Sequence, residues 1–177
     1  FADGHLVFWA NFSEPYLWDS KKSDITSVTI MEGVTSIGEY AFSGCSSLTA
    51  ITIPESVTSV GWLAFFGCNS LTAVHISSIE AWSKIRFSYD ANPLVYAHNL
   101  YLDGELVTEV TIPEGVTSIG DGAFRGCSSL KSVIIPDSVM EVGQVSFADC
   151  TSLETIILGE GIKKIYVYVE SSSIVYN

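Results

Sequence analysis

The stretch "CSSLTAITIPESVTSVGWLAFFGC" at residues 45–68 begins and ends with cysteine, and a close relative, "CSSLKSVIIPDSVMEVGQVSFADC", occupies residues 127–150. Cysteine, leucine and phenylalanine recur at an interval of 23 residues, following the template C-x-x-L-x-x-I-x-I-P-x-x-V-x-x-I-G-x-x-A-F-x-G. A unit this short cannot bury its apolar positions alone, so such units stack on one another. The repeat therefore predicts a solenoid of stacked parallel strands.

Copies of the template organise most of the chain. They begin near Ile25, at Cys45, at Cys68, near Leu106, at Cys127 and at Cys150. We therefore expect a solenoid over residues 25–165, with an irregular insertion unit at 77–105. Residues 1–24 fit no copy, and we interpret them as an N-terminal cap in which "HLVFWANF" pairs as a strand with the first repeat. Residues 166–177 alternate like a strand, which indicates a final strand or the start of a further domain.

Each residue type within one repeat has a local reason. Ile51 and Ile53 alternate with a threonine, which is the period of a strand with one buried face. Pro54 ends this strand because proline has no N–H to donate. We expect Gly61 at a corner that only glycine adopts easily, and the following Ala-Phe pair in a short helical turn that carries phenylalanine into the core. The residue that leaves this turn is expected to be left-handed, and it is Gly44, Gly67, Gly126 or Asp149.

Composition and charge exclude several classes of partner. The 177 residues are 47% hydrophobic and 16% charged, which is enough for an ordinary folded core. The formal net charge of −12 makes nucleic acid and anionic lipid surfaces poor partners. The longest apolar runs fall well short of the roughly 20 residues that span a bilayer, so we expect no membrane insertion. The chain starts abruptly at Phe1 and stops within an apolar stretch, and we interpret it as a fragment of a longer protein.

The segment "IPEGVTSIGDGAFRGCSSL" at residues 112–130 contains the template from its proline to its leucine. It resembles the leucine-rich repeat of the BspA-like, Treponema-type family of bacterial surface proteins, and the resemblance extends over residues 25–165. The resemblance implies a right-handed leucine-rich-repeat solenoid, β-rich with short helical turns, in a secreted or cell-envelope protein. It also implies adhesion to host or neighbouring-cell proteins, and it brings no catalytic residues.

The four cysteines recur in two pairs, Cys45 with Cys68 and Cys127 with Cys150. Equivalent positions in adjacent repeats lie about 4.8 Å apart, which falls within the Cα separations that a disulfide allows. Side chains at equivalent positions point the same way, which favours buried free thiols that pack as small hydrophobes. Both interpretations stay open from the sequence, whereas the lack of a C-x-x-C pair argues against a metal site.

The largest departure from the template lies between Leu71 and Leu106, where 35 residues take the place of one period. "SIEAWSKIRF" spaces its apolar residues at helical intervals, which predicts a short amphipathic helix. Asp103-Gly104 lies between two apolar arms and predicts a hairpin. We favour a variant repeat that keeps the core continuous, and the alternative is a projection that carries a binding surface.

Two aromatic residues occupy positions that are polar in other repeats. Trp62 takes the position of Glu39, Asp121 and Gln144, and Phe66 takes that of Ser43, Arg125 and Ala148. Either the insertion covers this pair with Trp82 and Phe87, or the pair is an exposed contact site. The candidate binding residues are Trp62, Phe66, Trp82 and His75. His75 is the one imidazole in a column of β-branched residues on the strand face, where solvation is the commoner role.

No arrangement typical of catalysis or metal binding occurs in the sequence. The three histidines lack the H-E-x-x-H spacing, and neither a G-x-S-x-G elbow nor a phosphate-binding loop is present. Carboxylates follow the strand-ending position in four repeats, and we interpret them as a solvated face. We therefore predict no enzyme activity, no cofactor and no metal.

The sequence thus favours a non-enzymatic module that binds a protein, in an extracellular or cell-envelope location. The expected partner is a host or bacterial surface protein, bound through a preordered surface. The first alternative is a carbohydrate-binding module, with Trp62 and Trp82 as stacking platforms for a glycan. The second is a structural spacer within a larger envelope protein.

Overall fold

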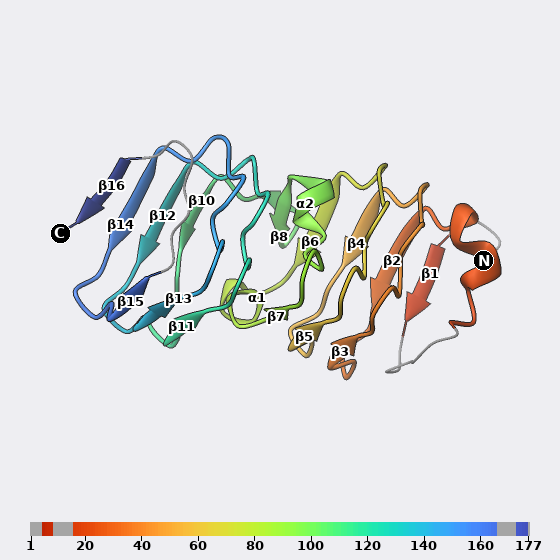
Figure 1. Ribbon diagram of the computed structural model, residues 1–177, viewed down its shortest axis with the longest axis horizontal. Coiled ribbons are helices and arrows are strands. Elements are labelled where there is room, and N and C mark those ends of the chain that lie inside the picture. Colours follow the sequence, from red (N-terminus) through yellow and green to blue (C-terminus); the bar gives the residue numbers. More distant parts are fainter. Residues whose placement is uncertain (1–4, 9–15, 166–172, 177) are drawn as a thin grey trace.

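The computed structural model describes residues 5–8, 16–165 and 173–176 as an elongated solenoid, with β1 His5–Phe8 and β16 Ser173–Tyr176 toward opposite ends of its long axis (Figure 1). Two sets of strands cross this axis and stack along it, one mainly of longer strands and one of two-residue strands. Each regular repeat contributes one strand to each set. The predicted leucine-rich-repeat solenoid is therefore confirmed as the fold class.

The longer strands form two main sheets. The first has the order β1-β2-β4-β6-β8-β9, with β1 His5–Phe8, β2 Ser27–Ile30, β4 Ala50–Thr52, β6 Ala73–Ile76, β8 Leu100–Leu102 and β9 Glu105–Leu106. The second has the order β10-β12-β14-β16, with β10 Glu109–Thr111, β12 Ser132–Ile135, β14 Thr155–Leu158 and β16 Ser173–Tyr176. The strands pair in parallel, apart from the antiparallel hairpin of β8 and β9.

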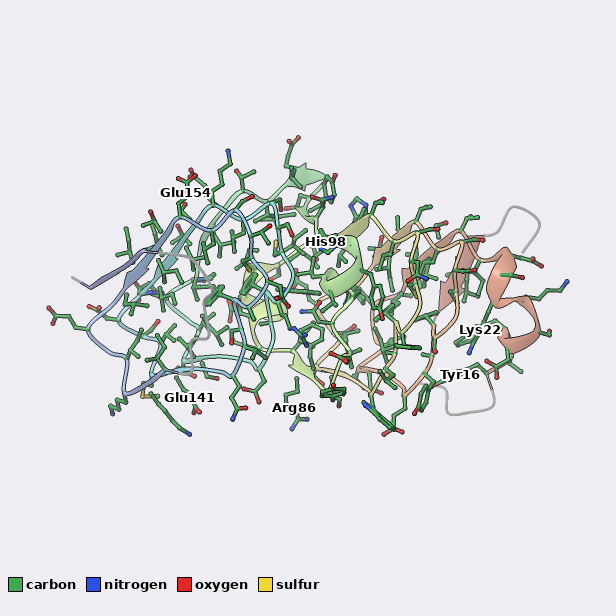
Figure 2. The ribbon with its side chains drawn as sticks, turned by 45° about the horizontal axis from the view of Figure 1, so that its top comes forward. Tyr16, Lys22, Arg86, His98, Glu141 and Glu154 are labelled. Carbon is green, nitrogen blue, oxygen red and sulfur yellow. The ribbon has the colours of Figure 1, made fainter. Side chains whose placement is uncertain are left out.

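The two-residue strands form two short sheets on the other side of the core. One contains β3 Ser36–Ile37, β5 Ser59–Val60 and β7 Arg86–Phe87, and the other contains β11 Ser118–Ile119, β13 Glu141–Val142 and β15 Lys164–Ile165. Charged side chains such as Arg86, Glu141 and Glu154 lie at the outer surface (Figure 2). The core occupies the space between the main and short sheets.

The inward phenylalanines stack from repeat to repeat, as predicted. Phe42 and Phe65 have ring centroids 5.4 Å apart, and Phe124 and Phe147 have ring centroids 5.5 Å apart. Full burial of one such side chain contributes about 1.5–3 kcal/mol relative to its exposure. Adjacent regular repeats therefore stabilise one another through stacked rings.

The Ala-Phe segment is a plain turn and not the helical turn that the sequence predicted. The reason is that its N–H groups are shared with the adjacent repeat, since Phe42 N–H donates to Ala64 O at 2.8 Å. The predicted left-handed exit is confirmed by φ values of 80°, 77°, 83° and 61° at Gly44, Gly67, Gly126 and Asp149.

The corner glycines are needed for space and not for backbone conformation, which corrects the expected reason. Gly61 and Gly143 do not have positive φ, but a Cβ atom on either would lie 2.6 Å from a backbone nitrogen of the preceding repeat, that of Glu39 or Asp121. Adjacent repeats therefore touch backbone to backbone at the corner. The left-handed residues come two positions later, at Tyr40, Leu63, Gly122 and Val145.

All four cysteines are buried free thiols. The thiols of Cys68 and Cys150 each donate at 3.1 Å to a carbonyl of the preceding repeat, Phe42 O and Phe124 O. Burial raises the pKa of Cys45 to about 11 and the pKa values of Cys68 and Cys150 to about 12. The thiols are therefore protonated at neutral pH and act as packing groups.

The insertion continues the core. The predicted helix is present as α1 Ile79–Ser83, begun by Ser78, whose Oγ accepts from the N–H of Ala81 at 3.1 Å. The predicted hairpin is present as β8 and β9, and a further helix, α2 Leu94–Ala97, was not predicted. Because β7 pairs with β5 and β8 pairs with β6, the insertion extends both sheets as a variant repeat does.

The hairpin also divides the array into two blocks, β1 to β9 and β10 to β16, and α1, α2 and β8 lie at the end of the first block that faces the second in Figure 1. On the side of the main sheets, β8 and β9 come between β6 and β10 in the chain. On the side of the short sheets, the insertion contacts the second block directly, because Gly120 N–H donates to Ser83 O at 2.8 Å. The first repeat of the second block thus packs directly against the insertion.

Tryptophan completes the hydrogen bonding at the start of each block. Within a block, the carbonyl before the inward phenylalanine, that of Ala64 or Ser146, accepts a backbone N–H from the preceding repeat. In the first repeat of each block, no backbone N–H of the described residues donates to the equivalent carbonyl, that of Ala41 or Ala123. Trp18 Nε1 instead donates to Ala41 O at 2.7 Å, and Trp82 Nε1 donates to Ala123 O at 2.9 Å. Two buried indoles therefore supply the donor that the backbone does not.

The ends of the chain are described only in part. β1 pairs in parallel with β2, as predicted for the N-terminal strand, and the 3₁₀ helix η1 Asp19–Asp24 precedes the first repeat. β16 pairs in parallel with β14. Residues 1–4, 9–15, 166–172 and 177 lie outside the described residues. The boundaries 1–24, 25–165 and 166–177 stay predictions.

Candidate functional site

Four aromatic residues lie on the turns that follow β3, β5 and β7, and we call them the aromatic edge: Tyr40, Trp62, Phe66 and Tyr89. Trp62 meets Tyr40 edge-on, with ring centroids 5.5 Å apart. Leu63 N–H donates to Tyr89 O at 3.3 Å, which places Tyr89 in the next repeat beside Trp62. The exposed fraction is 43% for Trp62, 55% for Phe66 and 73% for Tyr89.

These exposures contrast with the rings at the inner positions of the same repeats, such as Phe42 and Phe65, which are buried. Phe66 O accepts from Gly44 N–H at 2.8 Å, so the backbone of this turn is held by the preceding repeat while the ring stays exposed. Contiguous exposed apolar surface of this kind is typical of an interaction site. The structure thus brings Trp62 and Phe66 to one turn.

Trp82 does not belong to this surface, and its prediction as a binding residue or glycan platform is wrong. Its side chain is 1% exposed, its ring packs on Phe87 with centroids 5.2 Å apart, and its N–H is bonded to Ala123 O. The physical reason is that its indole N–H satisfies Ala123 O at the start of the second block, which holds the ring in the core. Trp82 also does not cover Trp62, which keeps its exposure.

His75 lies on β6, on the outward face of the main sheet and away from the turns that carry the aromatic edge. It is half-buried, and its ring stacks on Tyr101 of β8 with centroids 4.9 Å apart and an interplanar angle of 28°. The register pairs it with Thr52 of β4. The structure therefore does not bring His75 together with Trp62 and Phe66.

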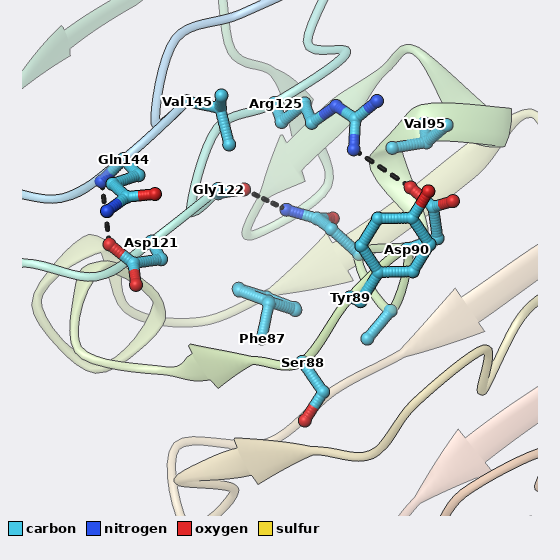
Figure 3. Close-up of a pocket in the computed structure, with 12 residues that line it drawn as sticks. Phe87, Ser88, Tyr89, Asp90, Val95, Asp121, Gly122, Arg125, Gln144 and Val145 are labelled. Carbon is cyan, nitrogen blue, oxygen red and sulfur yellow. Dashed lines mark hydrogen bonds and ion pairs between the residues drawn. The ribbon is translucent and has the colours of Figure 1, made fainter. Parts of the chain in front are cut away.

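A cleft of about 210 Å³ adjoins the aromatic edge, between the insertion and the second block (Figure 3). Phe87 and Tyr89 line it from the insertion, and Asp121 and Val145 line it from the second block. Val145 is exposed, with its backbone in the left-handed region at φ 49°. The cleft thus has apolar surface and one carboxylate on each side, and the carboxylate of the insertion, Asp90, is paired with Arg125.

Polar contacts across this cleft hold the two blocks together. Asn92 is 3% exposed and its Nδ2 donates to Gly122 O at 2.7 Å. Arg125 Nη1 pairs with Asp90 Oδ1 at 2.9 Å, and its Nε pairs with Asp149 Oδ2 at 3.2 Å. Burial lowers the pKa of Arg125, but its hydrogen bonds to Asp149 and Asp90 outweigh this and raise the pKa above its ordinary value. The guanidinium is therefore a fixed structural tie.

The described residues contain neither a metal-ligand cluster nor a membrane-spanning helix. Within residues 5–8, 16–165 and 173–176, no three His, Cys, Asp or Glu side chains come together as metal ligands would. None of the helices in these ranges has the length and apolar content required to cross a membrane.

Tyr89 and the cleft were not predicted from the sequence. The register joins Val60 to Phe87, so Tyr89, two residues later, has the same place in its repeat as Trp62. The signal was present in the sequence, because "Y-D-A" aligns with "W-L-A", but it appears only at a spacing of 27 residues. This spacing differs from the 23-residue period of the template, so the template does not include Tyr89.

Comparison with known proteins gave one family and several solved structures. The family model described as BspA type leucine rich repeat region matches residues 17–92 and 98–174, in six copies. The crystal structure of a T. pallidum leucine rich repeat protein is 23% identical, over 84% of this chain and 72% of that chain, with a TM-score of 0.41. A leucine-rich repeat protein from Eubacterium ventriosum is 20% identical, over 95% and 69%, with a TM-score of 0.34.

A leucine rich cell surface protein from Faecalibacterium prausnitzii is 18% identical, over 92% of this chain and 77% of that chain, with a TM-score of 0.30. The search of curated proteins gave no match. The family match covers most of the chain, and the gap between its two matched ranges contains α2 Leu94–Ala97, the helix that the template does not contain. The resemblance inferred from residues 112–130 is confirmed: this chain belongs to the family of BspA type leucine rich repeat proteins.

Proposed function

We propose that the chain is a protein-binding module whose contact surface is the aromatic edge, and that it serves adhesion at a bacterial cell surface. The observation that carries this proposal is the exposure of Trp62, Phe66 and Tyr89, at 43%, 55% and 73%, in repeats whose inner phenylalanines stack inside the core. Tryptophan and tyrosine are enriched among residues that dominate binding energy at protein interfaces.

The fold supports this function energetically. Backbone hydrogen bonds between repeats hold the turns of the aromatic edge, such as Tyr40 N–H to Trp62 O at 3.0 Å. A surface that is already ordered loses little conformational entropy on binding. Membership of a family of bacterial surface repeats supports an extracellular or cell-envelope location and a host or bacterial surface protein as the partner. No catalytic role is part of the proposal.

A glycan partner has weaker support. Of the three tryptophans that the described ranges contain, Trp18 and Trp82 are buried at 3% and 1% exposure, so a single indole, Trp62, is left as a stacking platform. The two-platform arrangement expected for the carbohydrate alternative is therefore absent from this surface. A structural spacer is the outcome in which neither kind of ligand binds.

The test is binding of the labelled chain to arrays of surface proteins and of glycans. Trp62→Ala is the variant, and Ile134→Ala is its matched control, because Ile134 is 42% exposed but lies on the main sheet. We expect protein signals that weaken about tenfold or more in Trp62→Ala, the size of an interface hot spot, and that persist in the control. Equal loss in both variants, loss confined to glycans, or no protein signal at all would contradict the proposal.

A further inference from the structure

The cleft beside the aromatic edge has the size for one long side chain. Its volume of about 210 Å³ is below the roughly 300–1,000 Å³ of pockets that hold drug-sized ligands. It corresponds to about seven water molecules at about 30 Å³ each. The ligand that this space fits is therefore one side chain of a larger molecule that rests on the neighbouring surface.

The charges of the cleft favour a cation over an anion. Its lining includes two carboxylates, Asp90 and Asp121, and one cation, Arg125, whose Nη1 and Nε pair with Asp90 and Asp149 at 2.9 and 3.2 Å. Asp121 Oδ1 accepts from Gln144 N–H at 2.6 Å, which fixes the carboxylate (Figure 3). No lysine or arginine nitrogen of the described chain lies within 4.0 Å of Asp121. The net charge of −12 adds long-range attraction for cations.

The lining of the cleft favours a cation with an apolar stem and a flat head. Phe87 and Val145 provide apolar surface, on which the methylene groups of a basic side chain pack while its charge stays at the carboxylate. Tyr89 adds a ring that is 73% exposed. A guanidinium stacks on such a ring and pairs with a carboxylate through two parallel hydrogen bonds, which an ammonium does not do.

We propose that this cleft receives an arginine side chain of the protein that the aromatic edge binds, with Asp121 as its carboxylate partner and Tyr89 as its stacking surface. The inference rests on the proposed function, since the arginine belongs to the bound protein. It adds the chemistry of recognition: the partner presents an arginine next to the apolar groups that contact Trp62.

The experiment uses the full chain, labelled with ¹⁵N, and N-acetyl-arginine amide as the probe, followed by amide NMR shifts. N-acetyl-citrulline amide is the matched probe, because it has the same shape without the charge. We expect arginine to shift the amides of Tyr89, Asp121, Gly122 and Val145 and to bind at least about tenfold more tightly than citrulline. Asp121→Asn is expected to weaken the binding of N-acetyl-arginine amide about tenfold, while its side-chain oxygen keeps the hydrogen bond from Gln144 N–H.

Asp137→Asn is the control, because Asp137 Oδ1 accepts from Glu160 N–H at 2.7 Å as Asp121 does from Gln144 but lies outside the cleft. The spectra also report whether each variant is folded. Equal shifts from arginine and citrulline, shifts at other amides, or an unchanged affinity in Asp121→Asn would overturn the inference. Because the probe needs no partner protein, its failure is separate from a failure of the Trp62→Ala array test.

Discussion

Replacing Trp82 with phenylalanine is expected to lower stability and to leave the aromatic edge unchanged. The substitution removes the N–H that donates to Ala123 O at 2.9 Å and leaves a gap in a side-chain site that is 1% exposed. A hydrogen bond contributes about 0.5–1.5 kcal/mol net, and a moderate large-to-small change in a core costs about 1 kcal/mol. The expected loss is about 2 kcal/mol, which lowers Tm by about 4–8 °C in a chain of this size.

Trp18→Phe is the matched comparison and should cost more. After Trp82→Phe, Ala123 O keeps one donor, because Asn92 Nδ2 lies 3.0 Å from it. After Trp18→Phe, Ala41 O keeps no other donor within the part of the chain that the structure describes. A buried acceptor without a partner costs about 1–3 kcal/mol, so the loss in Trp18→Phe includes this larger penalty.

Urea unfolding followed by circular dichroism measures the free energy of unfolding of both variants and the parent. The slope m, the dependence of this free energy on urea concentration, is compared as well, because arrays of repeats do not always unfold in one step and a changed m would reveal this. An additional variant, Trp82→Phe with Asn92→Ala, is expected to lose more than the sum of its two single changes, because both donors share Ala123 O. If Trp82→Phe is as stable as the parent within about 0.5 kcal/mol, or if Trp18→Phe loses less than Trp82→Phe, the capping role of the indoles is wrong.

The remaining predictions concern strain, space and ionisation. Val145→Gly should raise Tm, because a side chain at φ 49° carries about 1–2 kcal/mol of strain, whereas the larger conformational entropy that glycine loses on folding costs only about 0.5–1 kcal/mol. A lower Tm would contradict this expectation. Gly143→Ala should cost more than about 1 kcal/mol because its Cβ would lie 2.6 Å from backbone, whereas Gly115→Ala, with 3.5 Å to a flexible carboxylate, should be tolerated; equal melting of the two would refute the packing argument. Raising the pH from 8.5 to 10 should destabilise the chain, because the pKa values of Cys68 and Cys150 rise from 9.0 to about 12 on folding. The folded state then binds more protons than the unfolded state in this window, so the free energy of unfolding falls as pH rises. Replacing both thiols with alanine should flatten the urea-unfolding profile over that range, and an unchanged slope would count against the buried thiols as its cause.

The repeat itself made most of the fold predictable. The spacing of Cys45 and Cys68, and of Phe42 and Phe65, fixes the period, and the alternation around Ile51 fixes which strand face is buried. These features depend only on local sequence and on the need of each unit to stack. The same logic found α1 and the β8–β9 hairpin, whose signals are also local.

Features that depend on contacts between repeats were harder to predict from the sequence. The corner at Gly61 needs glycine because the backbone of Glu39 lies against it, and a template cannot distinguish this from a positive φ. The left-handed residue of that turn is Leu63, whose identity gives no hint of its conformation. The sequence left Trp82 open as a cover for Trp62 or a contact residue, because nothing near it in sequence shows that its indole N–H is bonded to Ala123 O, 41 residues later.

For the same reason, only part of the candidate site could be predicted from the sequence. Trp62 and Phe66 stood out as apolar residues at polar positions, whereas Tyr89 needed the pairing of Val60 with Phe87 to show that it shares the place of Trp62. The cleft is formed by two segments that are at least 26 residues apart in sequence, the separation of Val95 from Asp121. No local pattern could have placed them together.

The exposure of Trp62 is the central claim, and acrylamide quenching of tryptophan fluorescence tests it most directly. Trp9 lies outside the described residues, so it is replaced with phenylalanine in both proteins that are compared. Trp18 and Trp82 are 3% and 1% exposed, and Trp62 is 43% exposed. We predict that quenchable emission in this background disappears when Trp62 is also replaced with phenylalanine. If the emission that remains is quenched as readily as before, Trp62 is covered and the aromatic edge is not a contact surface.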